Sequence, residues 1–269
     1  MIVNIAGYRF VEIHDRGDLR ELLYERCNDL DLKGSILISP NGINFSLAGI
    51  AEKIDRFLQI LESDERFIGI PVKVSYTEYQ PFRRMLVKKK KEIISLGLEE
   101  IRPTEKTGPY ISPQDFKQLL DNEEEIVVLD TRNCYETRIG TFEGAIDLDI
   151  SSFREFPDAI KSLPNDMKSK KLVMFCTGGI RCEKASLVMM NAGYEDISQL
   201  EGGILAYFDQ CNGSHWTGDC FVFDQRVALD PNLQETNVEM CFKCREPLSR
   251  EEQDSDSYAI GEHCPYCLG

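Results

Sequence analysis

The stretch Leu172–Arg181 reads LVMFCTGGIR and places a cysteine at the end of an apolar run. This pattern predicts a buried strand, then a glycine-rich turn, then a helix that begins near Arg181 and ends near Gly193. Such a turn directs backbone N–H groups towards the sulfur of Cys176, and the helix N-terminus adds a partial positive charge. Together with the charge of Arg181, these groups are expected to lower the pKa of the thiol and stabilise a thiolate or a persulfide.

The length of the turn separates two kinds of cysteine chemistry. Four residues lie between Cys176 and Arg181, one fewer than in the loops that enclose a tetrahedral oxyanion in cysteine-dependent phosphatases. The shorter loop resembles that of a single-domain rhodanese, whose cysteine carries a persulfide. The alternative is an ordinary buried thiol at a strand end, since free cysteine is often buried. We interpret Cys176 and Arg181 as catalytic, and as the active-site loop we assign Thr177, Gly178, Gly179 and Ile180.

A second signature lies upstream, where residues 128–146 contain VLDTR, then YE, then GAI. Rhodanese domains open with a similar pattern, although their usual Gly-His-Ile is here Gly140-Thr141-Phe142. Asp130 ends a predicted buried strand, where its carboxylate can bond to loop backbone or to arginine. We expect Asp130 and Arg132 to support the domain rather than to catalyse. Cys182 is a third supporting residue: it could resolve an oxidised form of Cys176, or it could simply be a thiol packed in the helix.

Bulk composition restricts the class of protein. The chain has 269 residues, of which 42% are hydrophobic, enough for two domains and a small module. No stretch approaches the ~20 apolar residues that span a bilayer, and the N-terminus has no signal-peptide pattern. Ten cysteines that include a reactive thiol and two CxxC pairs fit a reducing compartment. We therefore predict a cytoplasmic protein without a membrane partner; the sequence does not indicate its oligomeric state.

The charge is distributed unevenly. The net charge of −15 argues against a general nucleic-acid binder and against DNA as a partner, and residues 1–110 are neutral overall. Within this neutral part lies a basic segment that could contact RNA phosphates. The alternative is a solvated face, because lysines also protect an edge strand from pairing. The basic segment consists of Arg83, Arg84, Lys88, Lys89, Lys90 and Lys91.

The order of predicted elements gives the fold class. Residues 1–101 follow the order strand, helix, strand, strand, helix, strand, with an extra strand over 85–94, as in a ferredoxin-like or acylphosphatase-like α+β domain. A linker follows over 102–111. Over 112–212, strands alternate with helices, which predicts a parallel α/β sheet covered on both faces, with Ser112 capping its first helix. Residues 213–269 form a C-terminal extension, in which we expect one short hydrophobic strand over 216–227.

Two CxxC pairs mark the end of the chain. Nineteen residues separate them, a spacing that matches a small structural zinc knuckle with four thiolates. The alternatives are two redox CxxC motifs or a metal that is lost from the purified protein. Neither a dinucleotide or phosphate-binding fingerprint nor a His-plus-carboxylate cluster is present in the sequence, so we expect no flavin, nicotinamide or catalytic iron. The predicted zinc ligands are Cys241, Cys244, Cys264 and Cys267.

These motifs occur together with Gly42-Ile43-Asn44, Lys91-Glu92-Ile93, Gly202-Gly203-Ile204 and the string CFVFDQRV over 220–227. The combination resembles the rhodanese-domain, oxygen-dependent tRNA uridine hydroxylases of bacteria, over nearly the whole chain. The resemblance implies an acylphosphatase-like domain, a rhodanese domain and a catalytic cysteine at Cys176. It also implies 5-hydroxyuridine formation at the wobble position of tRNA, with the anticodon loop as partner and molecular oxygen as co-substrate.

The residues add a mechanistic hypothesis to this resemblance. The Cys176 thiolate would add to C6 of uridine and make C5 electron-rich, while Arg181 and the loop N–H groups steady the negative charge. In a rival mechanism Cys176 carries a persulfide or an oxidised sulfur. Two other function classes stay open: a sulfurtransferase that passes persulfide sulfur to an acceptor, and a noncatalytic RNA-binding or protein-binding adaptor.

Overall fold

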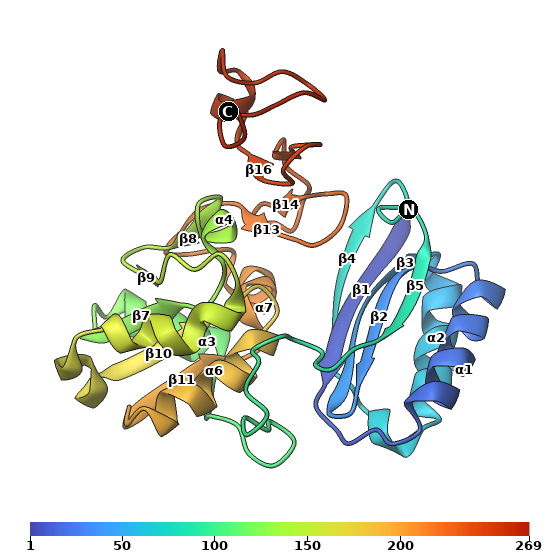
Figure 1. Ribbon diagram of the computed structural model, residues 1–269, viewed down its shortest axis with the longest axis horizontal. Coiled ribbons are helices and arrows are strands. Elements are labelled where there is room, and N and C mark those ends of the chain that lie inside the picture. Colours follow the sequence, from blue (N-terminus) through green and yellow to red (C-terminus); the bar gives the residue numbers. More distant parts are fainter. Residues whose placement is uncertain (269) are drawn as a thin grey trace. The chain divides into compact units, whose positions relative to one another are not determined.

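The computed structural model describes residues 1–268, which form two compact units: Met1–Thr107, and the described residues from Gly108 onwards. Each unit is built around its own β-sheet (Figure 1). The division falls inside the expected linker over 102–111. The last two residues of that linker, Tyr110–Ile111, form β6, a short strand at the edge of the sheet in the second unit.

The first unit is a five-stranded sheet in the order β4-β1-β3-β2-β5, with α1 and α2 on one face (Figure 1). The four strands β4, β1, β3 and β2 pair antiparallel, and β5 is added parallel to β2. This is the predicted ferredoxin-like order with its extra strand. The elements are β1 (Ile2–Arg9), α1 (Arg16–Asp29), β2 (Lys33–Ser39), β3 (Gly42–Gly49), α2 (Ala51–Glu62), β4 (Val72–Thr77) and β5 (Met85–Lys89), with a 3-10 turn at Glu65–Phe67.

The basic strand is shorter than the predicted range 85–94. It ends at Lys89, and the N–H of Lys90 makes a last bond to the carbonyl of Ile38. The carboxylate of Glu92 then accepts from the N–H groups of Leu96 and Gly97 at 3.1 and 3.0 Å. These bonds turn the chain, so the predicted extension of the strand is wrong.

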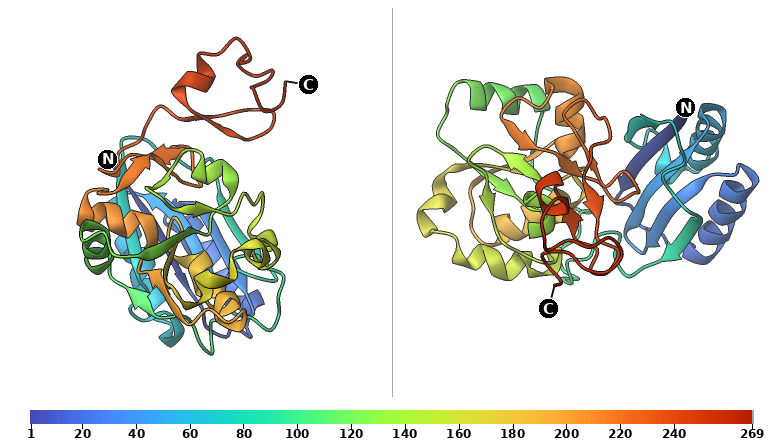
Figure 2. Two further views of the ribbon diagram at one scale, coloured as in Figure 1. Left: turned by 90° about the vertical axis from the view of Figure 1, so that its left-hand side faces the viewer. Right: turned by 90° about the horizontal axis from the view of Figure 1, so that it is seen from above.

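The second unit contains a five-stranded sheet in the order β6-β11-β10-β7-β9 with all strands parallel, as predicted. Helices lie on both faces, with α3 and α7 packed together on one of them (Figure 2). Ser112 caps α3 through a bond from the N–H of Asp115. The elements up to residue 211 are β6 (Tyr110–Ile111), α3 (Pro113–Asp121), β7 (Ile126–Asp130), α4 (Cys134–Thr137), β8 (Gly140–Phe142), β9 (Ile146–Asp147), α5 (Phe156–Ala159), β10 (Lys171–Phe175), α6 (Ile180–Asn191), β11 (Asp196–Leu200) and α7 (Gly203–Cys211), with 3-10 turns at Phe153–Glu155, Ile160–Ser162 and Asn165–Ser169.

The C-terminal extension completes the core of this unit. Trp216 lies in β12 (Trp216–Gly218), which pairs antiparallel with β8. Its ring packs edge-on against Phe142 and Phe208, with centroids 5.1 and 5.3 Å apart. The extension is therefore continuous with the aromatic core under the parallel sheet.

The prediction of one short strand within residues 216–227 is wrong, because this stretch contains two strands. After β12 the chain forms β13 (Cys220–Phe221), turns, and returns as β14 (Ala228–Leu229). The turn forms because the Asp224 carboxylate accepts from the N–H and the guanidinium of Arg226. The final elements are β15 (Glu239–Met240), β16 (Pro247–Leu248) and α8 (Arg250–Gln253).

Candidate active site

Cys176 lies directly after β10 at the carboxyl edge of the parallel sheet, where α/β folds place their ligands. Its side chain is buried, and the N–H of Gly179 donates to Sγ at 3.1 Å. The N-terminus of α7 fixes the loop backbone: Ile204 donates to the carbonyl of Cys176 at 3.0 Å and Leu205 to that of Thr177 at 3.1 Å. The predicted strand, turn and helix are thus present, and the turn is held by a second helix.

Gly203 makes this close approach possible. Its φ is +68°, and a Cβ at this position would lie 2.3 Å from the carbonyl oxygen of Cys176 and 2.7 Å from the nitrogen of Gly179. Any side chain would displace the loop. The Gly202-Gly203-Ile204 motif, quoted above only for its resemblance, therefore has a physical role in shaping the thiol loop.

The surroundings of Cys176 favour a thiolate. Burial acts to raise its pKa, but the hydrogen bond from Cys182, the charge of Arg181 and the N–H groups of Arg181 and Cys182 outweigh burial and lower the pKa to about 5. Burial and the neighbouring Cys176 raise the pKa of Cys182 well above its usual range. The opposite directions of the two pKa shifts favour the thiolate on Cys176 and the proton on Cys182, whose Sγ lies 3.7 Å from Oγ1 of Thr131.

Arg181 forms a buried ion pair with Glu136. Its two terminal nitrogens contact the two carboxylate oxygens at 2.5 and 2.8 Å, and the side chains are 5% and 0% exposed. Burial acts to raise the pKa of Glu136, but the pairing with Arg181 outweighs burial and the pKa is lowered. The guanidinium thus contacts Glu136 with both terminal nitrogens, and it also interacts with Cys176 through its charge and a hydrogen bond. A direct role of Arg181 on substrate stays a prediction.

Asp130 and Arg132 form a second buried ion pair, with both side chains 0% exposed and a nitrogen–oxygen distance of 2.7 Å. Arg132 also donates to the carbonyl of Gly140 at 2.6 Å and lies against the ring of Trp216, 5.3 Å from its centroid. Thr141 donates to Asp130 at 2.8 Å. Thr141, which replaces the usual histidine, thus donates a hydrogen bond to the Asp130 carboxylate. The ion pair of Asp130 and Arg132 links β7, β8 and β12.

The second unit brings together the catalytic, loop and supporting residues that the sequence indicated around Cys176. Glu136 belongs to the Tyr135-Glu136 pair of the upstream signature, but no role for it was predicted from the sequence. A signal was available, because Glu136 follows Asn133 at the spacing of a capping box, and its carboxylate does accept from the N–H of Asn133 at 3.2 Å. The contact with Arg181 spans 45 residues and could not be read from that spacing.

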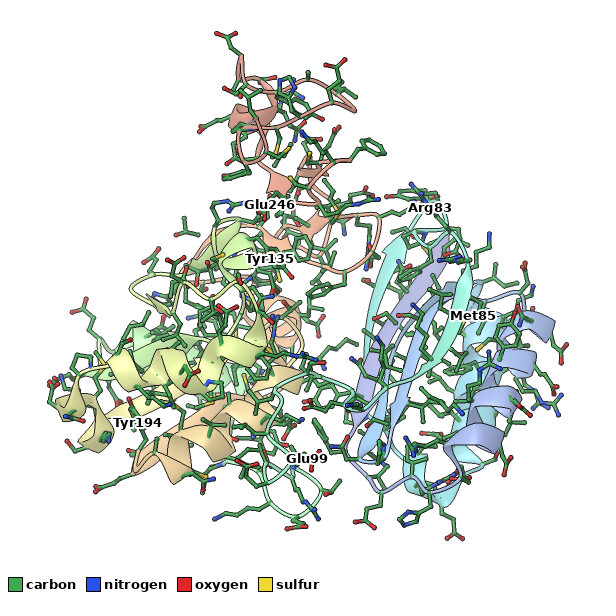
Figure 3. All side chains as sticks on the ribbon, in the orientation of Figure 1. Arg83, Met85, Glu99, Tyr135, Tyr194 and Glu246 are labelled. Carbon is green, nitrogen blue, oxygen red and sulfur yellow. The ribbon has the colours of Figure 1, made fainter. Side chains whose placement is uncertain are left out.

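The basic segment belongs to the first unit. Arg83 and Arg84 lie in the loop before β5, Lys88 and Lys89 end the strand, and Lys90 and Lys91 follow it (Figure 3). All six side chains are exposed, and none pairs with a carboxylate of residues 1–268. They lie at the edge of the sheet, so they are free to bind an anion and they also protect the edge from pairing.

The four cysteines of the two CxxC pairs lie together at the C-terminus, with their sulfur atoms within 4.8 Å of one another. Three sulfur–sulfur distances are 3.5, 3.7 and 3.9 Å. A tetrahedral ion with Zn–S bonds of about 2.3 Å needs sulfurs about 3.8 Å apart. This group could hold a metal ion, and it forms the centre of a small core with Leu248 and Tyr258.

Arg138 connects this cysteine module to α4, the helix beside the thiol loop. It directly follows α4, the helix that carries Glu136, and it pairs with Glu246 at 2.8 Å. Its guanidinium also lies 4.0 Å from the centroid of the Tyr266 ring, between the last two cysteines. One short helix therefore contacts both the thiol loop and the cysteine module.

Among residues 1–268, no helix combines the length and apolar character needed to cross a membrane. The two sheets and the thiol loop define a rhodanese-like protein with an acylphosphatase-like N-terminal domain. Family comparisons agree: the UPF0176 acylphosphatase-like domain matches residues 2–93, and the rhodanese-like domain matches residues 112–210.

Full-length relatives are more specific. A protein of Cupriavidus taiwanensis named tRNA uridine(34) hydroxylase is 48% identical, over 100% of this chain and 97% of its own length. One from Ralstonia nicotianae with the same name is 45% identical, over 99% and 96%. A solved rhodanese-like domain from Anabaena is 25% identical, covers 41% of this chain and 79% of its own, and has a TM-score of 0.34. The chain belongs to the tRNA uridine(34) hydroxylase family.

Proposed function

We propose that this protein is an enzyme that hydroxylates uridine 34, the wobble uridine of tRNA, to 5-hydroxyuridine with molecular oxygen, and that Cys176 is its nucleophile. The observation that carries the proposal is the lowered pKa of Cys176 in a loop whose N–H groups converge on its sulfur. A thiolate is the reactive form of cysteine, and it can attack an electron-poor ring carbon. Family membership supplies the substrate.

The reaction can be written with all atoms accounted for. The Cys176 thiolate bonds to C6 of uracil, and the electrons of the C5–C6 double bond move to C5 and O4. C5 then bonds to one atom of molecular oxygen, and protonation of the other oxygen atom gives a hydroperoxide on C5. Two reducing thiols cleave the O–O bond, leaving a hydroxyl on C5, one water and a disulfide. Loss of the C5 proton and departure of the thiolate restore the double bond.

The residues around Cys176 take supporting roles in this proposal. Because Cys176 is buried, the attack requires a rearrangement that exposes its sulfur to the base. Released from the sulfur, the N–H of Gly179 can donate to a charged intermediate, and the field of Arg181 favours the same charge. Glu136 keeps Arg181 in place, and Asp130 with Arg132 keeps β7 and β8 together.

We also propose that the anticodon loop of tRNA is the partner and that the basic segment contacts its phosphates. The six exposed cations of this segment can attract the negatively charged phosphates of RNA, whereas the second half of the chain is acidic and repels them. A reducing cytoplasm is the proposed compartment, because none of the ten cysteines, all within residues 1–268, forms a disulfide.

We propose structural zinc in the four-cysteine module. The three short sulfur–sulfur distances are those of a thiolate tetrahedron, and the segment has too small an apolar core to fold without a metal. Plasma mass spectrometry of purified protein should find about one zinc per chain, and Cys241→Ser should lose it. Cys211→Ser, which changes a buried thiol of α7 outside the module, should retain it. Equal metal content in the two variants would refute the assignment.

The function is tested by nucleoside mass spectrometry of tRNA incubated with the protein and dithiothreitol. In air, wild type and Cys211→Ser should add one oxygen to uridine 34, whereas Cys176→Ser and an anaerobic sample should not. Hydroxylation by Cys176→Ser would refute the role of Cys176. The same loop could hold a persulfide, so exchange of oxygen for sulfur would assign a sulfurtransferase. An unchanged nucleoside in the wild-type sample would favour a binding adaptor.

A further inference from the structure

Three aromatic side chains form a row beside the candidate active site. Tyr135 lies on α4 directly before Glu136 (Figure 3). Its ring meets that of Phe221 edge to face, with centroids 5.4 Å apart, and Phe221 meets Phe223 in the same way at 5.1 Å. The row therefore leads from α4, whose Glu136 pairs with Arg181, to the turn between β13 and β14.

The exposure of the rings changes abruptly along this row. Phe221 is 3% exposed, whereas Phe223 is 63% exposed. A single exposed apolar side chain is common and has no meaning by itself. Phe223 differs because one edge of its ring is fixed by Phe221 while the rest is available for a flat partner.

The turn that carries Phe223 is held rigidly. Asp224 and Arg226, directly after Phe223, form an ion pair whose side chains are each 7% exposed. The N–H of Val222 donates to the carbonyl of Val227 at 2.8 Å. Val227 has a φ of +61°, a conformation that is costly for a β-branched residue and that often occurs at functional sites. Buried polar groups and a strained backbone thus fix an exposed aromatic ring.

We propose that Phe223 stacks on a nucleobase of tRNA that flanks the target uridine. The inference deepens the proposed function and rests on it. A uridine can reach a buried thiol only if it leaves its stack, and its neighbours then need a replacement partner. The acidic second half of the chain disfavours phosphate contacts, so the flat face of a base is the part of RNA that suits an uncharged ring.

The test uses the full-length protein and anticodon stem-loop RNAs with 2-aminopurine at position 33 or 35. Wild type should quench the fluorescence at one of these positions. Phe223→Ala should abolish the quenching and weaken binding by roughly tenfold, the order expected for one stacked base. Phe223→Trp should restore both. Phe242→Ala is the matched control, because Phe242 is 61% exposed and lies in the cysteine module.

Two further measurements make the outcome specific. Thermal unfolding and the thiolate absorbance of Cys176 should match wild type in Phe223→Ala, so that a binding defect is not a folding defect. Quenching and affinity equal to wild type in Phe223→Ala would overturn the inference, as would a loss of affinity with unchanged fluorescence. Wild-type hydroxylation of tRNA is assayed in parallel. If it fails, the proposed function fails; if it succeeds while Phe223→Ala behaves like Phe242→Ala, only the stacking inference fails.

Discussion

Arg181 and Glu136 lie face to face, with two guanidinium nitrogens on two carboxylate oxygens and almost no solvent around them. The positive charge beside the thiolate is thus fixed by a residue on another helix. A buried pair of this kind contributes little net stability, but removal of one partner leaves an uncompensated charge. The pair fixes the geometry of the site.

We expect Glu136→Gln and Arg181→Met each to lower the free energy of unfolding by ~3–5 kcal/mol, because each leaves one buried group without its partner. The double variant should lose much less than the sum. Urea unfolding of the four proteins gives the coupling energy. Arg250 and Asp254, an exposed pair whose side chains are 70% and 60% exposed, provide the control cycle, with coupling near zero. Strictly additive effects at Glu136 and Arg181 would contradict the pairing.

The Cys176 thiolate should titrate near pH 5, as measured by the absorbance at 240 nm that wild type has and Cys176→Ser lacks. Cys182→Ala should move this midpoint upwards, because the hydrogen bond from Cys182 is the largest of the effects that lower the pKa. Cys27→Ala is the control, since burial raises the pKa of Cys27 to about 12 and it contributes no thiolate. A midpoint unchanged by Cys182→Ala would show that the hydrogen bond is absent.

The same shift makes stability depend on pH. The pKa of Cys176 is about 5 in the folded protein, against 9.0 for an ordinary thiol, so the folded state binds its proton less readily. The stabilisation relative to Cys176→Ala should therefore be complete above about pH 9 and decrease as the pH falls towards 5. Denaturant unfolding of both proteins at several pH values measures the difference. A constant difference over this range would contradict the shift.

Gly203→Ala should destabilise the protein and raise the pKa of Cys176, because the new methyl group overlaps the loop backbone. Gly193→Ala is the matched control. Gly193 has a φ of +88°, but a Cβ there meets nothing within 4 Å, so this variant bears only the cost of the backbone conformation. We expect Gly203→Ala to unfold ~1–3 kcal/mol more easily than Gly193→Ala, and to lose hydroxylation. Equal free energies of unfolding for Gly203→Ala and Gly193→Ala would mean that the thiol loop accommodates the methyl group without loss of stability.

Reversal of charge in the basic segment should weaken tRNA binding. Lys88→Glu with Lys90→Glu should reduce the affinity and also the steepness of its salt dependence, by ~0.7–0.9 in slope for each phosphate that the protein no longer neutralises. Lys106→Glu with Lys161→Glu changes the net charge equally at exposed lysines outside the segment and should have a smaller effect. Filter binding at several salt concentrations measures both. If the two double variants behave alike, only overall charge matters.

The sequence predicted those features that depend on local patterns. The strand, turn and helix around Cys176 and the Ser112 cap follow from short-range signals, and both are confirmed. Contacts that depend on tertiary structure were out of reach. The chain turns after β5 because the Glu92 carboxylate accepts hydrogen bonds from two backbone N–H groups, and the sequence had placed Glu92 within a strand.

The same limit explains what was missed at the site. Glu136, which pairs with Arg181, lies 45 residues before it in the chain. Gly203, which lies against the thiol loop, is the first residue of α7. Thr141 bonds to Asp130 only because β8 runs beside the end of β7. The sequence pattern places these residues in motifs. Their contact partners follow only from the folded structure.

The position of Trp216 has a consequence for synthesis on the ribosome. The ring packs against Phe142 and Phe208 and lies against Arg132, so the parallel sheet lacks one ring of its aromatic core until Trp216 has been translated. The ring is held in this core by the strand β12, which pairs with β8. We therefore expect a nascent chain that is stalled before Trp216 to carry Cys176 next to an incomplete core.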